Sequence, residues 1–245
     1  MHEDITIKDG ETLDILCGEK VALIQKKDGY RFSIDSILIS NFVRLKNGER
    51  VLDIGSGCGV IPIYLSKKGF KNRFMGVEIQ KELFSLCNRN KLLNRCDNIE
   101  FVHGDIRIIK DKLKADPFDV IISNPPYTKE SSGRKSPKSS KLVARCERTL
   151  KLEEIMEVSK SLLKFLGRLY LIYPAHRLTE VIYNGKVFGL EPKRLRFVHS
   201  RMNERATLVL LEFIKGAKSN VIVEKPLYVY NDSNYTEEVK GYYLI

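Results

Sequence analysis

The stretch VLDIGSGCGVIPIYLSKK, residues 51–68, combines an apolar run of strand length, a glycine turn and the first turns of a helix. Glycines at alternate positions of the turn allow the backbone to bend sharply and to approach a ligand closely. In a doubly wound α/β fold, such a junction lies at the carboxyl edge of the sheet, where ligands bind. The pattern predicts this fold and a binding site that includes Asp53, Gly55, Ser56, Gly57 and Gly59.

The sequence on either side of this stretch alternates between apolar runs and amphipathic segments. The expected strands are residues 51–54, 73–78, 99–103, 118–123 and 167–173, and the expected helices are 60–69, 80–94 and 148–166. This alternation implies right-handed crossovers and a mostly parallel sheet with helices on both faces. Two later runs, 194–200 and 206–214, are joined by a connection so short that they are expected to pair as an antiparallel hairpin.

The domain organisation follows from where the alternation begins. Residues 1–45 precede it and are expected to form an N-terminal extension, with a β-rich start and a helix, that packs on the rest of the chain. Residues 46–245 are expected to form the main domain.

Composition narrows the class of protein. The five cysteines form no C-x-x-C pair and the four histidines are far apart, so we expect neither a disulfide framework nor a metal site. The charged N-terminus lacks the apolar core of a secretory signal, and no apolar run approaches the length of a membrane span. These features predict a cytoplasmic protein with no membrane partner.

Acidic residues end two further strands of the expected sheet. Glu78 ends the second strand, where an acid can bind ribose hydroxyls, and Asp105 closes the third, where it can accept from an adenine amino group. A dinucleotide site needs G-x-G-x-x-G, but Val60 stands where the last glycine would be. The acids predict a ligand with a ribose, an adenine and a positive centre, and S-adenosylmethionine fits this description.

Four motifs in order carry a resemblance to a known family. D-x-G-x-G-x-G, GVEIQ (76–80), HGDI (103–106) and NPPY (124–127) resemble those of class I S-adenosylmethionine-dependent methyltransferases. The resemblance implies a Rossmann-like fold with a seven-stranded, mostly parallel sheet that ends in an antiparallel C-terminal hairpin. It also implies cofactor binding by Asp53, Gly55, Ser56, Gly57, Gly59, Glu78, Ile79, Asp105, Ile106 and Asn124.

The stretch VIISNPPYTK, residues 120–129, ends a buried strand with two prolines that fix φ and cannot donate to a sheet. The Asn124 side-chain oxygen and the Pro125 carbonyl can accept the protons of a ring amine and align its lone pair with the methyl group. Tyr127 can stack on a planar substrate. We expect a catalytic site formed by Asn124, Pro125, Pro126 and Tyr127.

A basic segment suggests that the substrate is nucleic acid. The chain carries a net charge of +11, and between Lys129 and Lys151 eight basic residues stand against two acidic ones. Such a segment attracts phosphates and makes binding dependent on salt. The expected RNA-binding residues are Lys129, Arg134, Lys135, Lys138, Lys141 and Arg145. A second set of cations either extends this surface or is simply solvated: Arg194, Arg196, Arg201 and Arg205.

Further segments resemble the bacterial tRNA methyltransferase family that acts on N6 of adenine 37 in a valine tRNA. These segments are YRFSIDSILISNF (30–42), LVARCERTLKLEEIMEVSKSLLK (142–164), GLEPKRLRFVHSR (189–201) and KPLYVYNDSNYTEEV (225–239). This closer resemblance adds Phe32 and Asp35 near the cofactor pocket. The chain departs from the family at Cys146, where a histidine is expected.

The leading hypothesis is methyl transfer from S-adenosylmethionine to the N6 amine of an adenine in RNA, with tRNA as the expected substrate and a monomer as the favoured state. Other amine acceptors remain open: a glutamine side-chain amide of a translation factor, or N6 of adenine or N2 of guanine in ribosomal RNA. A third alternative is an RNA-binding protein that keeps the cofactor as a structural ligand. The intact segment 124–127 argues against that alternative.

Overall fold

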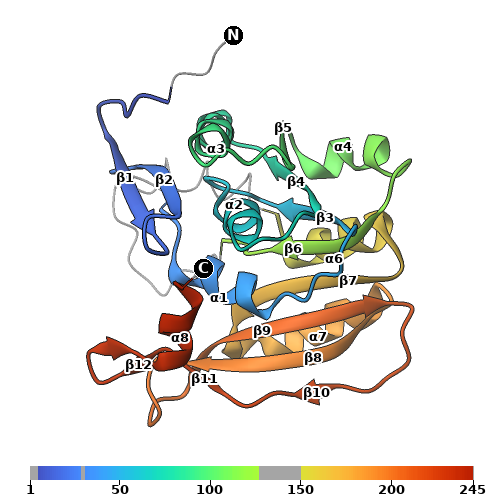
Figure 1. Ribbon diagram of the computed structural model, residues 1–245. Helices are drawn as coiled ribbons and strands as arrows, with labels where there is room; N and C mark the ends of the chain where they lie inside the picture. The colour runs from blue at the N-terminus through green and yellow to red at the C-terminus, as the bar shows by residue number, and fades with distance from the viewer. Residues whose placement is uncertain (1–4, 29–30, 127–149, 245) are drawn as a thin grey trace, which may run out of the picture.

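A computed structural model of the chain describes residues 5–28, 31–126 and 150–244 (Figure 1). Its central feature is a nine-stranded sheet in which seven strands of five residues or more are supplemented by two short ones. The seven strands lie in the order β8-β9-β7-β6-β3-β4-β5. Their bounds are β3 Arg50–Ile54, β4 Arg73–Glu78, β5 Ile99–His103, β6 Phe118–Ser123, β7 Leu163–Pro174, β8 Leu190–His199 and β9 Ala206–Lys215.

The strand directions match the predicted Rossmann-like fold. Neighbouring strands from β5 to β7 pair in parallel, while β9 pairs antiparallel with both β7 and β8. The predicted C-terminal hairpin is therefore confirmed. The second strand of this hairpin, β9, lies between β7 and β8. The first strand, β8, is therefore the outer long strand and runs parallel to β7.

Helices cover both faces of the sheet (Figure 1). One hydrophobic core joins one face to α1, α2 and α3, and a second joins the other face to α4, α6 and α7. Val120 and Ile122 of β6 pack into the first core and Ile121 into the second, because successive strand residues point to opposite faces. The helices are α1 Ile34–Phe42, α2 Val60–Lys67, α3 Lys81–Leu93, α4 Ile106–Leu113, α6 Leu152–Leu162 and α7 Leu178–Val187, with a 3₁₀ turn, η1, at Ala175–Arg177.

The predicted helix over 148–166 extends too far at its carboxyl end. α6 ends at Leu162, and Leu163 already pairs with Phe118 in the sheet. The Lys164 ammonium lies 2.8 Å from the Asp119 carboxylate, which fixes this start of β7 beside β6. A tertiary contact across the sheet thus ends an amphipathic pattern that would otherwise continue.

The N-terminal segment forms the antiparallel hairpin β1 (Glu11–Leu16) and β2 (Val21–Lys26), followed by α1. Leu23 and Ile24 of β2 are fully buried in the same core as α2 and α3. The boundary of a separate extension at residue 45 remains a prediction.

The C-terminal segment runs back along the outer strand. β10 (Ile222–Val223) and β11 (Leu227–Tyr228) pair in parallel with β8, and a small hairpin, β12 (Tyr230–Asn231) with β13 (Asn234–Tyr235), precedes α8 (Glu237–Tyr242). α8 packs beside α1 (Figure 1). None of the helices in the described ranges has the length and apolar character needed to cross a membrane.

Candidate cofactor and acceptor site

The sheet brings the predicted site residues to one edge. Ile54 at the end of β3 pairs with Val77 of β4 on one side and with Ser123 of β6 on the other. Glu78 pairs with His103 at the end of β5. The segments that follow these strands therefore emerge side by side, and they carry Gly55, Asp105 and Asn124.

The glycine turn between β3 and α2 has the left-handed backbone that its sequence predicts. Gly55, Gly57 and Gly59 have φ of 77°, 60° and 84°. A Cβ at Gly59 would lie 2.8 Å from the Phe101 ring, whereas a Cβ at Gly55 would meet no atom within 4 Å. Gly59 thus permits close packing, and Gly55 leaves open space over the end of β3.

Glu78 supports this turn from the end of β4. One carboxylate oxygen accepts a hydrogen bond from the Gly57 N–H at 2.9 Å, and the other accepts from the Gln80 N–H at 2.8 Å. The side chain is buried, and burial raises the pKa of its carboxyl group while these N–H donors act in the opposite direction. A carboxylate has about four acceptor sites, so two remain for ribose hydroxyls.

Asp53 lies in β3 beneath the turn and is 2% exposed. Within the described ranges, neither of its carboxylate oxygens has a hydrogen-bond partner. Burial raises the pKa of Asp53 to about 7; the nearby Ser56 hydroxyl acts in the opposite direction, and the negative charge of Glu78 adds to the rise. A buried acid without a partner is unfavourable, so the position fits a ligand that brings a positive charge.

Asp105 is the N-cap of α4 and differs from Asp53 in having a strong partner. Its carboxylate accepts from the Arg107 backbone N–H at 3.0 Å and from the Arg107 guanidinium at 2.6 Å, and the guanidinium also reaches Glu154 of α6 at 3.1 Å. These bonds to Arg107 lower the pKa of Asp105. Sequence reasoning missed Arg107, although its place two residues after a strand-end acid was a usable signal.

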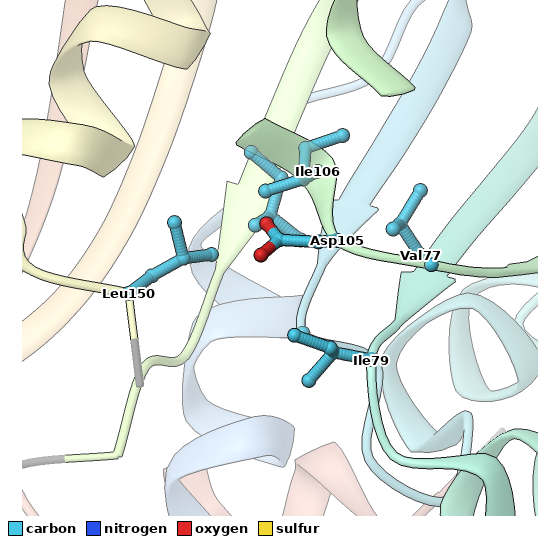
Figure 2. Close-up of a pocket in the computed structure, with 8 residues that line it drawn as sticks. Val77, Ile79, Asp105, Ile106 and Leu150 are labelled. Carbon is cyan, nitrogen blue, oxygen red and sulfur yellow. The ribbon is translucent and has the colours of Figure 1, made fainter. Parts of the chain in front are cut away.

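Figure 2 shows a small pocket beside these groups, with the Asp105 carboxylate directed between Ile79 and Leu150. Its lining is otherwise apolar or glycine, which suits a flat ring that offers an amino group to one acid. The lining residues are Ile54, Gly55, Val77, Ile79, Gly104, Asp105, Ile106 and Leu150. Four of them, Gly55, Ile79, Asp105 and Ile106, are residues that the sequence assigned to the cofactor.

Asn124 follows β6 on the other side of β3. Its side-chain nitrogen donates to the Ser36 hydroxyl of α1 at 3.0 Å, and the Ser123 hydroxyl donates to the Ile54 carbonyl oxygen at 2.9 Å. These bonds orient the amide and fix the end of β6 against β3. Pro125 is buried and Pro126 is exposed. Ser36 was not predicted, since 88 residues separate it from Asn124.

Phe32 and Asp35 lie at the start of α1. The Phe32 N–H donates to the Gln25 side-chain oxygen at 2.8 Å, and burial raises the pKa of Asp35. Neither residue lines the pocket of Figure 2. The remaining predicted site residues lie outside the described ranges: Tyr127, Lys129, Arg134, Lys135, Lys138, Lys141, Arg145 and the atypical Cys146.

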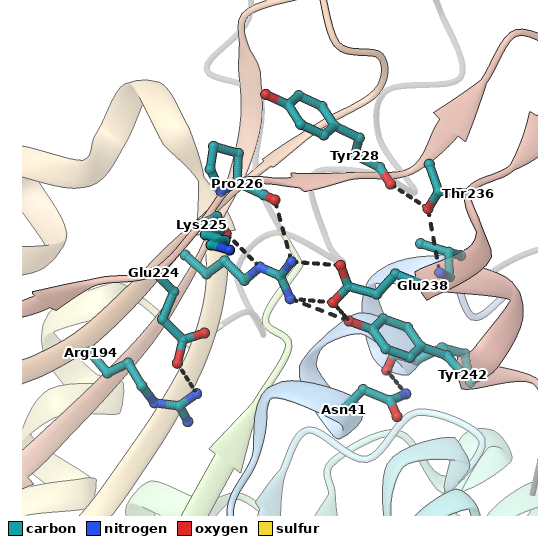
Figure 3. Close-up of polar contacts among 12 residues, drawn as sticks. Asn41, Arg194, Glu224, Lys225, Pro226, Tyr228, Thr236, Glu238 and Tyr242 are labelled. Atoms are coloured by element: carbon teal, nitrogen blue, oxygen red, sulfur yellow. Dashed lines mark hydrogen bonds and ion pairs between the residues drawn. The ribbon is translucent and has the colours of Figure 1, made fainter.

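The structure gives two of the additional arginines a role within the protein. Arg194 is 5% exposed, lies 2.8 Å from Glu212 and 3.0 Å from Glu224 (Figure 3), and its guanidinium lies over the Phe42 ring. Arg196 binds both carboxylate oxygens of Glu238 in α8. Both arginines therefore hold the C-terminal segment to β8. A role of Arg194 and Arg196 in RNA binding stays a prediction.

In the same described ranges, no group of three or more histidine, cysteine, aspartate or glutamate side chains is arranged to hold a metal ion. The site consists of a glycine turn, three buried or half-buried acids, an apolar pocket and an oriented amide. This donor set can bind a nucleoside with a positive centre on one side and an amine on the other.

Comparisons with known proteins agree with this arrangement. Residues 45–214 match the family model described as a methyltransferase domain. A protein of Dyadobacter fermentans named tRNA1(Val) (adenine(37)-N6)-methyltransferase is 25% identical over 218 residues, which cover 86% of this chain and 89% of that protein. A protein of the same name from Porphyromonas gingivalis is 30% identical over 168 residues, covering 67% and 65%.

A solved structure shares the fold. It is described as a predicted O-methyltransferase from Agrobacterium tumefaciens, and its TM-score is 0.69 at 20% sequence identity. The similarity covers 85% of this chain and 94% of that one. The predicted class I methyltransferase fold is confirmed.

Proposed function

Because the chain belongs to the methyltransferase-domain family, we propose that it transfers a methyl group from S-adenosylmethionine to the N6 amine of an adenine in RNA. The relatives named above support tRNA as the RNA and adenine 37 of a valine tRNA as the target. One observation carries the proposal most directly: the Asn124 amide, oriented by Ser36, stands at the end of β6 beside the turn that follows β3.

The cofactor half of the site fits S-adenosylmethionine, which supplies a methyl group bound to a positively charged sulfur. Glu78 is assigned to the ribose hydroxyls and Asp105 to the adenine amino group, with Ile79 and Ile106 against the ring. Asp53 is buried without a partner in the described chain, which supports a positive charge nearby. Gly55 leaves the space that the ligand needs.

On the acceptor side, Asn124 and the Pro125 carbonyl oxygen are assigned to the two protons of the adenine amine. Holding both acceptors rigidly aligns the nitrogen lone pair and stabilises the positive charge that develops on nitrogen. The prolines fix φ, so the turn does not have to reorganise during the reaction. Tyr127 is assigned to stacking on the base, which must leave its own stack to reach the site.

RNA selection is assigned to the basic segment that follows Tyr127. Its six predicted RNA-binding residues lie outside the described ranges, and its composition supports contacts with phosphates. A tRNA substrate also places the enzyme in the cytoplasm, and we propose that it acts there as a monomer.

Purified protein incubated with labelled S-adenosylmethionine tests the proposal. Unmodified tRNA and a glutamine-containing peptide of a translation factor are supplied separately, and tRNA nucleosides are analysed by mass spectrometry. We expect label in N6-methyladenosine of tRNA, and labelling roughly 10²–10³ times slower with Asn124→Ala. Label on the peptide glutamine, or on N2 of guanine, would overturn the assignment of the acceptor.

A further inference from the structure

Asn90 of α3 and Asn94, the C-cap residue of this helix, bind the inner edge of the N-terminal hairpin. Asn90 accepts from the Ile24 N–H at 2.7 Å and donates to the Ile24 carbonyl oxygen at 3.0 Å, and Asn94 makes the same pair of bonds with Ala22 at 3.0 and 2.6 Å. One helical turn advances about 5.4 Å and two strand residues about 6.6 Å, so the spacings nearly match. The two amides thus take the place of a neighbouring strand.

The two asparagines differ in their third hydrogen bond. The Asn90 side-chain nitrogen also donates to the Cys58 carbonyl oxygen of the glycine turn at 2.9 Å, whereas that of Asn94 donates to the Asn90 carbonyl oxygen at 2.7 Å. Asn90 has no exposed surface. A single buried amide therefore joins α3, β2 and the glycine turn.

β2 continues this connection towards the acceptor side. Gln25, which follows Ile24 and is 1% exposed, accepts from the Phe32 N–H at 2.8 Å through its side-chain oxygen. Phe32 leads into α1, whose Ser36 receives the hydrogen bond of Asn124. Hydrogen bonds and the backbone segments between them thus connect the glycine turn, through the hairpin, to the amide of the acceptor side.

We propose that Asn90 is a positioning residue that holds the glycine turn in its cofactor-binding shape by anchoring it to β2. This inference rests on the proposed function, in which the turn binds S-adenosylmethionine. Glycines are flexible, so a turn that contains three of them must be restrained from outside if it is to be organised before the ligand arrives. Glu78 supplies one restraint from β4, and the hairpin supplies another through Asn90, which makes the hairpin part of the cofactor site.

Asn90→Ala and Asn94→Ala form a matched pair that tests the inference. Each removes two bonds to β2, so both should lower the melting temperature of the ligand-free protein to a similar extent. Of the two, only Asn90→Ala removes a bond to the turn. We expect it to raise the Kd for S-adenosylmethionine about tenfold, on the scale of one net hydrogen bond. Asn94→Ala should change Kd less than twofold, as measured by calorimetry well below the melting temperature.

An equal change of Kd in the two variants would overturn the inference and leave the proposed function standing. A wild-type protein that does not bind S-adenosylmethionine would overturn both. Should Asn90→Ala not fold, Asn90→Ser replaces it, because serine keeps a small polar side chain at this buried position while shortening its reach to the Cys58 carbonyl oxygen. The serine variant is expected to weaken binding severalfold, and an unchanged Kd would count against the role of Asn90.

Discussion

The two halves of the site use different chemistry. On the cofactor half, the ends of β3, β4 and β5 carry Asp53, Glu78 and Asp105, and the pKa of each carboxyl group is displaced by its surroundings. On the acceptor half, the end of β6 carries Asn124, which does not titrate and is oriented by Ser36. In the proposed assignment, the half for the charged cofactor thus uses ionisable groups, whereas the half for the neutral amine uses a fixed dipole.

The acids of the cofactor half also differ from one another. Asp53 and Asp105 have the same side chain at the same edge of the sheet, yet burial raises the pKa of Asp53 and the Arg107 guanidinium lowers that of Asp105. The residue type alone therefore does not set the charge at this edge. The partner that the fold supplies sets it.

The largest expected effect is on the acceptor half. Asn124→Ala should lower kcat by roughly 10²–10³, the usual loss when one preorganised polar group is removed from a transition state. The Kd for S-adenosylmethionine should change less than twofold, because the amide is assigned to the amine. Single-turnover kinetics and calorimetry measure the two quantities. A variant with near wild-type kcat, or one with lost cofactor binding, would remove the distinction between the halves.

A smaller effect is expected on the cofactor half from Glu78→Ala. The change removes the acceptors of the Gly57 and Gln80 N–H groups and of the ribose hydroxyls, so the Kd for S-adenosylmethionine should rise about 100-fold, equivalent to roughly 3 kcal/mol. Glu82→Ala, at an exposed site in the first turn of α3, is the matched control and should leave Kd unchanged. Calorimetry that gives the same Kd for both variants would reject the assignment of Glu78.

The smallest effect concerns pH. Because the pKa of Asp53 rises from 3.8 to about 7 on folding, the ligand-free folded state keeps a proton that the unfolded chain releases above about pH 4. The contribution of this group to stability is present at low pH and is lost as pH rises through about 7. Asp53→Asn removes this dependence. The melting temperature of the variant minus that of wild type should therefore be several degrees larger at pH 8 than at pH 5.

Thermal unfolding of both proteins at the two pH values measures this difference. If the difference in melting temperature between variant and wild type is the same at both pH values, Asp53 is charged in the folded protein at both. In that case the contrast between Asp53 and Asp105 would not exist.

Much of the fold was predictable because its signals are local. The apolar runs of β3 to β6, the glycines of the first turn and the prolines after β6 act on their own backbone, and the structure has each of these features where the sequence predicted it. The helices α4 and α7 were missed, and α6 was predicted too long. In α6 the error arose because the pairing of Leu163 with Phe118 competes with the helix, and that pairing is not visible in the local pattern.

The sequence by itself determined the order of the elements and which residue types stand at the strand ends, because φ preferences and apolar spacing act between near neighbours. Only the tertiary structure decided that β9 lies between β7 and β8 and that Arg107 engages Asp105 while Asp53 has no hydrogen-bond partner in the described chain. It also decided that Ser36 binds Asn124 and that Asn90 binds the glycine turn. These outcomes depend on contacts that form only when the sheet and its helices pack, since packing determines which polar group each buried side chain meets.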